Sequence, residues 1–128
     1  MPLANAEPKS PAVRTALVIE DDLAIRESIQ MTFELEGIDV VVAENGEAGL
    51  AALNQISNPG VIFLDLMMPK MNGFQFMEHL REHPRNPAIP IVVISAFSDT
   101  DFPVPVAAKL TKPFSMADLL TFAFKYCQ

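Results

Sequence analysis

The sequence lacks tryptophan, has a single cysteine (Cys127), and carries only 9 lysine and arginine residues against 16 acidic ones, for a formal net charge of −7. One cysteine cannot form an internal disulfide, which excludes a disulfide-stapled secreted domain. The scarcity of positive charge leaves no electrostatic footprint for nucleic acid or for anionic membranes. No apolar run approaches the roughly 18 residues that span a bilayer, and residues 1–12 hold no signal-peptide core. These absences predict a soluble, acidic protein of the cytoplasm.

What the chain does have is enough apolar material for one core, and more proline than usual. Half of its 128 residues are hydrophobic, and 11 are proline. Pro2, Pro8 and Pro11 lie among polar residues near the start. We therefore expect a flexible, proline-rich tail over residues 1–14 and one globular domain over residues 15–128.

Within that domain, short apolar runs alternate with segments of helical periodicity. Runs that are apolar throughout are typical of strands covered on both faces, and the alternation predicts an α/β domain with a doubly wound, five-stranded parallel sheet. The expected strands are residues 16–19, 39–43, 61–65, 91–95 and about 106–110, and the expected helices are 23–36, 47–56, about 74–83 and about 116–126.

The connection between the fourth and fifth strands is too short to hold a helix like those in the other connections. Only about ten residues separate Ser95 from Val106, and they include Pro103 and Pro105. A crossover that contains a helix needs at least ~10–12 residues, and two close prolines block helix propagation. We expect the fourth helix, within residues 96–105, to be absent, reduced to a turn, or mobile.

Polar side chains follow several of these strands where the strands end. Glu20 and Asp21 follow the first strand, Asp65 and Ser95 end the third and fourth, and Lys112 comes shortly after the fifth. Parallel strands bring their carboxyl ends to one edge, where convergent carboxylates favour Mg²⁺. A metal, an ammonium and a hydroxyl around one carboxylate suit phosphoryl transfer onto that carboxylate. Each residue alone has a plain structural explanation, such as a turn or a helix start, and the signal lies in their joint occurrence.

Four segments carry a resemblance to a known family. The chain resembles the receiver domain of two-component response regulators over about residues 15–127, and the segment around Asp65 is the most specific. The segments are Leu17-Val18-Ile19-Glu20-Asp21-Asp22, Ile62-Phe63-Leu64-Asp65-Leu66-Met67-Met68-Pro69-Lys70-Met71-Asn72-Gly73, Val93-Ile94-Ser95-Ala96 and Leu110-Thr111-Lys112-Pro113-Phe114. The resemblance implies a flavodoxin-like (βα)5 fold.

The resemblance also implies a metal site. Asp65 would be the phosphoacceptor, and Glu20 and Asp21 would match the family's acidic pair, with Asp21 the more direct ligand of Mg²⁺. The backbone carbonyl of Met67 would complete the ligand set. Asp22 is better interpreted as the start of a helix.

Two further residues match the family's pattern, and one does not. Ser95 would be the switch hydroxyl that follows the phosphoryl group, and Lys112 would be the family's lysine, with a cis bond to Pro113. The family usually has an aromatic residue three positions before this lysine, where this chain has Lys109. An ammonium cannot enter an apolar pocket as a ring can, so the usual coupling of serine and ring is in question.

The leading hypothesis is a single-domain regulator. It would accept a phosphoryl group on Asp65 from a histidine kinase or histidine phosphotransfer protein and signal through altered contacts with a downstream protein. It would not be an enzyme on external substrates, although the resemblance implies self-phosphorylation and self-dephosphorylation with Mg²⁺. The alternative is a binding module on the same fold that no longer depends on phosphorylation. A phosphatase on a related α/β fold is disfavoured, because Met67 stands where one such family has a second aspartate.

One expectation concerns packing on the last helix. Phe122 and Tyr126 fall off the apolar face set by Met116, Leu119 and Ala123. We favour the interpretation that they cover the space left by a reduced fourth helix, with an exposed aromatic patch as the alternative.

Overall fold

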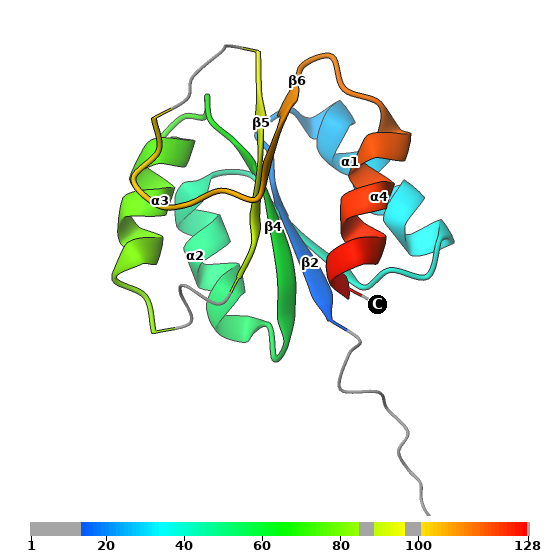
Figure 1. Cartoon of the computed structure of the whole chain (residues 1–128), viewed down its shortest axis with the longest axis horizontal. Helices are drawn as coiled ribbons and strands as arrows, with labels where there is room; N and C mark the ends of the chain where they lie inside the picture. Colours follow the sequence, from blue (N-terminus) through cyan, green and yellow to red (C-terminus); the bar gives the residue numbers. More distant parts are fainter. Residues whose placement is uncertain (1–13, 85–88, 97–100, 128) are drawn as a thin grey trace, which may run out of the picture.

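The computed structural model describes residues 14–84, 89–96 and 101–127 (Figure 1). The expected tail therefore lies outside the described residues except for Arg14. Among the described residues, no helix has the length and apolar character needed to cross a membrane.

The sheet has five strands, all parallel, as the apolar runs predict. Their order is β3-β2-β4-β5-β6, so β3 lies on one side of β2 and the later strands lie on the other. This reversal of strand order places a crevice at the carboxyl ends of the neighbouring strands β2 and β4. The strands are β2 (Thr15–Ile19), β3 (Val40–Ala43), β4 (Pro59–Asp65), β5 (Ile91–Ser95) and β6 (Ala108–Thr111).

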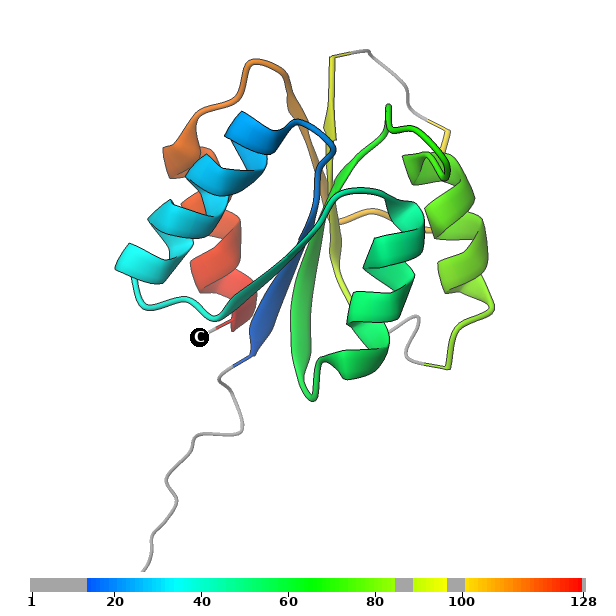
Figure 2. The same cartoon turned by 180° about the vertical axis from the view of Figure 1, so that it is seen from behind.

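Helices cover both faces of this sheet, as Figures 1 and 2 show from opposite sides. α2 and α3 lie on one face, and α1 and α4 lie on the other. The described helices are α1 (Leu23–Leu35), α2 (Gly46–Gln55), α3 (Gly73–Arg81) and α4 (Met116–Cys127). The doubly wound, flavodoxin-like α/β fold is thus confirmed.

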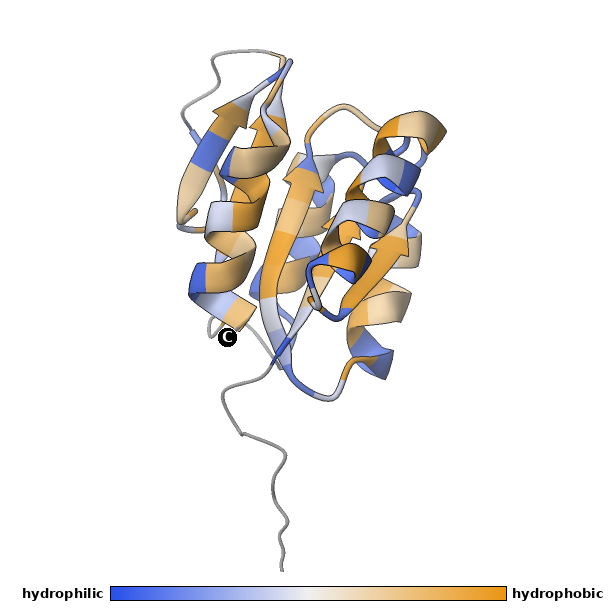
Figure 3. Cartoon of the chain, turned by 90° about the vertical axis from the view of Figure 1, so that its right-hand side faces the viewer, coloured by the Kyte–Doolittle hydropathy of each residue, from blue (hydrophilic) through white to orange (hydrophobic). Residues whose placement is uncertain are grey.

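Alternate residues of the central strand feed two separate apolar clusters. Ile62 and Leu64 of β4 pack toward α2 and α3, whereas Val61 and Phe63 pack toward α1 and α4. Both sides of the strand are therefore buried, which explains why its sequence is apolar without alternation. Figure 3 shows the same feature as strands that are hydrophobic along most of their length.

α1, the helix that follows Glu20-Asp21-Asp22, begins where the sequence predicts and ends one residue earlier than expected. The side chain of Asp22 accepts a hydrogen bond of 3.0 Å from the backbone N–H of Ile25 and so caps α1. Gly37, just after the helix, has a φ of 78°, a conformation that costs other residues energy. The last helix is capped in the same way, since the Ser115 hydroxyl oxygen accepts from the N–H of Asp118 at 3.3 Å.

The crossover from β5 to β6 contains no helix in residue 96 or in residues 101–107, the part that the structure describes. The predicted reduction of the fourth helix is confirmed for those residues, while residues 97–100 lie outside the described chain. β6 begins at Ala108, two residues later than expected. In Figure 1 the described part of this crossover runs from beside α3 to β6.

The crossover itself fills the space that a helix would occupy. Val104 is buried, and Phe102 and Val106 pack against the cluster beneath α2 and α3. Phe102 stacks on Phe74 of α3 with ring centroids 6.0 Å apart, and Arg81 of α3 donates a 3.5 Å hydrogen bond to the Pro103 carbonyl. The crossover is thus tied to α3 by an aromatic pair and a polar contact.

The expectation for Phe122 and Tyr126 is wrong. Both pack against the other cluster, on the face covered by α1 and α4, and both are half-buried. They can neither fill a space on the α2–α3 side nor form a fully exposed patch. The error has a simple cause: helical periodicity gives the angle of a side chain around its own helix, but it does not identify the layer to which the helix belongs.

Candidate functional site

The carboxylates that the sequence places at strand ends do converge. Glu20 follows β2 and Asp65 ends β4; the first is fully buried and the second is 2% exposed. Asp21, the next residue along the chain, is exposed. One oxygen from each of these three side chains lies within 4.8 Å of the other two. Since β2 and β4 are adjacent parallel strands, their register brings these carboxylates together.

Lys112 closes the cluster from the loop after β6. Its Nζ lies 3.1 Å from Glu20 Oε1 and 3.4 Å from Asp65 Oδ2. The peptide bond between Lys112 and Pro113 is cis, as the resemblance implies. The lysine side chain is about one-quarter exposed, so these ion pairs are partly shielded from water.

Backbone N–H groups fix two of the carboxylate oxygens. The N–H of Asp22 donates to Glu20 Oε2 at 3.0 Å, and the N–H of Met67 donates to Asp65 Oδ1 at 3.2 Å. Glu20 Oε1 is buried and makes the ion-pair contact with Lys112, but it accepts no hydrogen bond from the residues that the structure describes. A buried anionic oxygen without a donor is costly, which favours a further positive ligand at this point.

The crowding changes the acid–base properties of the cluster. Burial, reinforced by the negative charge of Glu20, raises the pKa of Asp65 from 3.8 to about 7, although the positive charge of Lys112 opposes the shift. Burial acts to lower the pKa of Lys112, but the charges of Glu20 and Asp65 outweigh it, and the pKa lies above its usual value of 10.5. The lysine therefore stays protonated at neutral pH.

These residues fit Mg²⁺. They offer carboxylate oxygens at close spacing, one exposed ligand at a water-facing edge, and a buried oxygen without a donor. Mg²⁺ is typically held by one or two carboxylates and keeps several waters, which matches this small, open cluster. The further ligand expected from the carbonyl of Met67 stays a prediction, because the only contact described for that residue here is its N–H.

Ser95 occupies the predicted place at the end of β5. It is fully buried and pairs in register with Thr111 of β6, while Asp65 of β4 pairs with Ile94 beside it. The N–H of Lys112 donates to the Ser95 carbonyl at 2.8 Å, so the serine and the lysine are joined through the backbone. Lys109, which stands in place of the family's aromatic residue, is half-buried on β6 opposite Val93.

Sequence reasoning overlooked Arg26, which contacts the loop that carries the acidic pair. Its Nη1 donates to the backbone carbonyl of Glu20 at 2.9 Å and to that of Asp21 at 3.3 Å. The sequence carries no clear signal for this contact, because its acceptors are backbone carbonyls.

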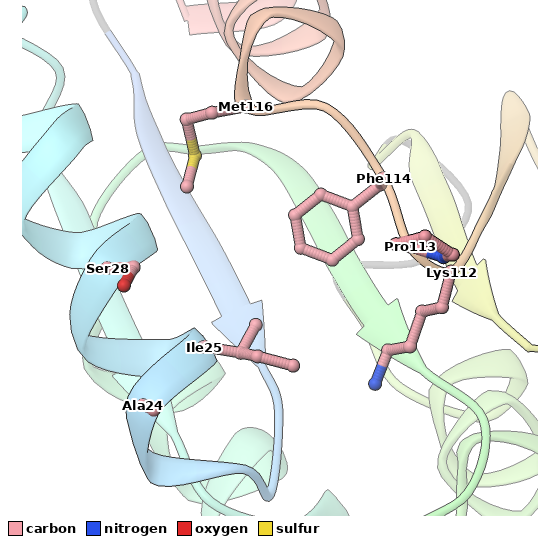
Figure 4. A pocket seen from close by; sticks show the side chains of 7 residues that line it. All are labelled: Ala24, Ile25, Ser28, Lys112, Pro113, Phe114 and Met116. Carbon is pink, nitrogen blue, oxygen red and sulfur yellow. The ribbon is translucent and has the colours of Figure 1, made fainter.

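A mainly apolar groove of about 560 Å³ lies beside the cluster. In Figure 4, Ala24, Ile25 and Ser28 on α1 face Phe114 and Met116, and Lys112 extends from the same loop. The groove opens next to Lys112, so apolar surface adjoins the charged cluster.

Comparison with known proteins points to one family. The family model for the response regulator receiver domain matches residues 16–123. The regulator RpaA of Synechocystis, described as a DNA-binding dual master transcriptional regulator, is 35% identical over 109 residues, and the phosphate regulon regulator PhoB of Escherichia coli is 33% identical over 112. The matches cover 81% and 84% of this chain but only 45% and 48% of those proteins, so the chain spans less than half the length of these two relatives.

Solved structures show the same similarity in three dimensions. A response regulator receiver protein from Pseudomonas putida superposes with a TM-score of 0.79 at 28% identity, covering 89% of this chain and 98% of the other. The receiver domain of the Francisella response regulator 1452 gives 0.76 at 32% identity, with 88% and 95% covered. The family model, the relatives and the solved structures all point to one family, and the chain belongs to the family of response regulator receiver domains.

Proposed function

We propose that Asp65 accepts a phosphoryl group from a phosphohistidine of a histidine kinase or phosphotransfer protein, and that the phosphorylated chain changes its contacts with a downstream protein. The observation that carries the proposal is the placement of Asp65 between an ammonium and two further carboxylates. Lys112 lies 3.4 Å from Asp65 Oδ2, while Glu20 and Asp21 supply the remaining ligand oxygens.

The proposed reaction forms one bond and breaks one. An oxygen of Asp65 attacks phosphorus, the N–P bond of the donor breaks, and its electron pair stays on the imidazole nitrogen, which then takes up a proton. A bound Mg²⁺ would supply positive charge to the oxygens of the transferred group. Lys112 offers a second, fixed positive charge at the same place. Catalysis of this kind depends on position and on charge neutralisation rather than on covalent chemistry by the protein.

Other features support the same function. The N–H of Met67 holds Oδ1 of Asp65, and Lys112 lies beside Oδ2, the oxygen that we propose as the nucleophile. Ser95 at the neighbouring strand end offers a hydroxyl for the phosphoryl group. The single buried cysteine and the absence of a disulfide among the described residues fit a reducing compartment, and we place the protein in the cytoplasm.

The test is phosphorylation by a small phosphodonor such as acetyl phosphate, followed by intact-protein mass spectrometry. Wild-type protein with Mg²⁺ should gain the mass of one phosphoryl group, which is lost at alkaline pH. Omission of Mg²⁺ or the substitution Asp65→Asn should abolish the gain.

Asp118→Asn is the matched control, because it makes the same chemical change on an exposed residue in the first turn of α4. It should be phosphorylated like the wild type. A wild-type chain that gains no mass while a known receiver does so in the same buffer would contradict the proposal and favour a phosphorylation-independent binding module.

A further inference from the structure

Arg26 connects the first helix to the loop that carries the acidic pair. It lies one turn into α1, and its own backbone N–H donates to the Asp22 carbonyl at 2.9 Å. The guanidinium turns back toward the strand, where Nη1 reaches the carbonyl of Glu20 at 2.9 Å and that of Asp21 at 3.3 Å. A single side chain therefore bridges two successive carbonyl groups between β2 and α1.

The described side-chain contacts of Arg26 are with the loop and not with its own helix. The partial positive charge at the beginning of α1 is offset by the carboxylate of Asp22, which caps the helix, so helix electrostatics give Arg26 no particular role. Its hydrogen bonds to the carbonyls of Glu20 and Asp21 are charge-assisted, and such bonds are roughly twice as strong as neutral ones. Arg26 is therefore best explained by what it does for the loop.

Those carbonyls belong to two residues whose side chains are part of the carboxylate cluster. Fixing the peptide groups on both sides of Asp21 sets the direction of its Cα–Cβ bond. The effect matters most for Asp21, since it is exposed and burial cannot hold its side chain. Glu20, by contrast, is fully buried and also held by Lys112 and by the N–H of Asp22.

We propose that Arg26 is a positioning residue for the divalent cation: it holds the backbone of Glu20 and Asp21 so that their carboxylates are ready to bind the ion. The role rests on the proposed function. Groups that orient metal ligands without touching the metal commonly change metal affinity by roughly 10–100-fold when they are replaced.

Charge alone predicts the opposite effect, which makes the proposal sharply testable. The guanidinium is always positive and lies close to the cluster, so it repels a bound cation. If Arg26 acted only through its charge, its removal would tighten cation binding. If it positions the ligands, its removal weakens binding despite the loss of a repulsive charge.

The experiment measures the affinity of the full chain for Mn²⁺, used in place of Mg²⁺, from the free-ion signal in electron paramagnetic resonance. Arg26→Met should weaken binding by about tenfold. Arg26→Lys keeps the charge but loses the planar guanidinium, so its affinity for Mn²⁺ should lie between those of Arg26→Met and the wild type. Arg81→Met on α3 is the matched control, because Arg81 pairs with Glu78 and the Pro103 carbonyl and should leave affinity unchanged.

Thermal unfolding by circular dichroism checks that each variant is folded at the temperature of the titration. Unchanged or tighter binding by folded Arg26→Met overturns the positioning role while leaving the proposed function intact. Wild-type protein that binds no Mn²⁺ contradicts both. Equal weakening in Arg26→Met and Arg81→Met also overturns the role, because it would show a general effect of losing an arginine.

Discussion

The ammonium of Lys112 lies 3.4 Å from Oδ2 of Asp65, although 47 positions separate the two residues in the chain. The contact joins the loop after the edge strand β6 to the end of the central strand β4. It places a fixed positive charge at the oxygen where we propose that a phosphoryl group is attached.

Lys112→Met should slow phosphorylation of Asp65 by a small donor by roughly a hundredfold, because it removes a charge that would be present throughout the transfer. The rate is measured by quenching and intact-protein mass spectrometry. Lys125→Met, an equal charge change at an exposed position of α4, should leave the rate within about twofold. Equal rates for Lys112→Met and the wild type would exclude a role for this lysine in the transfer.

Asp65→Asn should stabilise the protein in metal-free buffer at about pH 8, by on the order of 1 kcal/mol, because it removes a buried negative charge that lies close to two other carboxylates. The free energy of unfolding from urea titrations checks this, with Asp118→Asn as the control. Mg²⁺ should raise the stability of the wild type more than that of Asp65→Asn, since the ion binds only the folded cluster. A destabilised Asp65→Asn would show that the carboxylates do not repel one another in the way described.

Gly73→Ala should destabilise the protein by roughly 2 kcal/mol. A Cβ at this position would lie 2.7 Å from the Asp65 carbonyl oxygen and 2.8 Å from Leu66 Cα, so the start of α3 would have to move away from the end of β4. Gly37→Ala is a useful comparison, because it meets no atom within 4 Å and costs only the strain of a positive φ, about 1 kcal/mol. Urea unfolding measures both, and equal costs would contradict the close approach at Gly73.

The Phe74–Phe102 stack should couple the crossover to α3. A double-mutant cycle with Phe74→Leu and Phe102→Leu, read as free energies of unfolding, should give a coupling of about 1 kcal/mol. Pairing Phe102→Leu with Phe114→Leu, which packs on the other face of the sheet, should give almost none. Strictly additive effects for Phe74 and Phe102 would mean that the stack does not anchor the crossover.

The thiol of Cys127 should be unreactive in the folded protein. Burial raises its pKa from 9.0 to about 11, which alone lowers the thiolate fraction at pH 8 roughly a hundredfold. Alkylation by iodoacetamide, followed by mass spectrometry, should be far slower in native buffer than in denaturing urea. Fast modification of the native protein would contradict the burial of Cys127.

The same shift has a consequence for stability. The folded state holds the thiol proton of Cys127 more tightly than the unfolded chain does. The resulting contribution to the free energy of unfolding is complete below about pH 9 and is lost as the pH rises through about 11. Wild-type protein should therefore lose more stability across this window than Cys127→Ala. Parallel losses in the two proteins would refute the shift.

The sequence predicts the site well because its charged residues stand at or just after the ends of the parallel strands. Apolar runs identify the parallel strands, and the residue that follows each run must lie at the same edge of the sheet. Asp65, Glu20 and Lys112 are found together for this reason, although they come from different parts of the chain. The sequence also predicts the lack of a helix in residues 101–107, because the crossover is short and contains Pro103 and Pro105.

Other features required three-dimensional information. The side of the sheet on which Phe122 and Tyr126 pack depends on the direction in which the chain turns after β6, which helical periodicity does not encode. The filling of the vacant helix position by Phe102 and Val104 depends on tertiary packing with α3. Arg26 acts on backbone carbonyls, and no spacing of side chains in the sequence marks such a contact.

The most direct test of the central claim is to locate the acyl phosphate chemically. After reaction with acetyl phosphate and Mg²⁺, borohydride reduces a phosphorylated aspartate to homoserine, which peptide sequencing by mass spectrometry assigns to one position. We predict homoserine at position 65 and nowhere else, and none when Mg²⁺ is omitted. Homoserine at another aspartate, or its absence from a protein that is folded and binds Mn²⁺, would contradict the assignment of Asp65 as the phosphoacceptor.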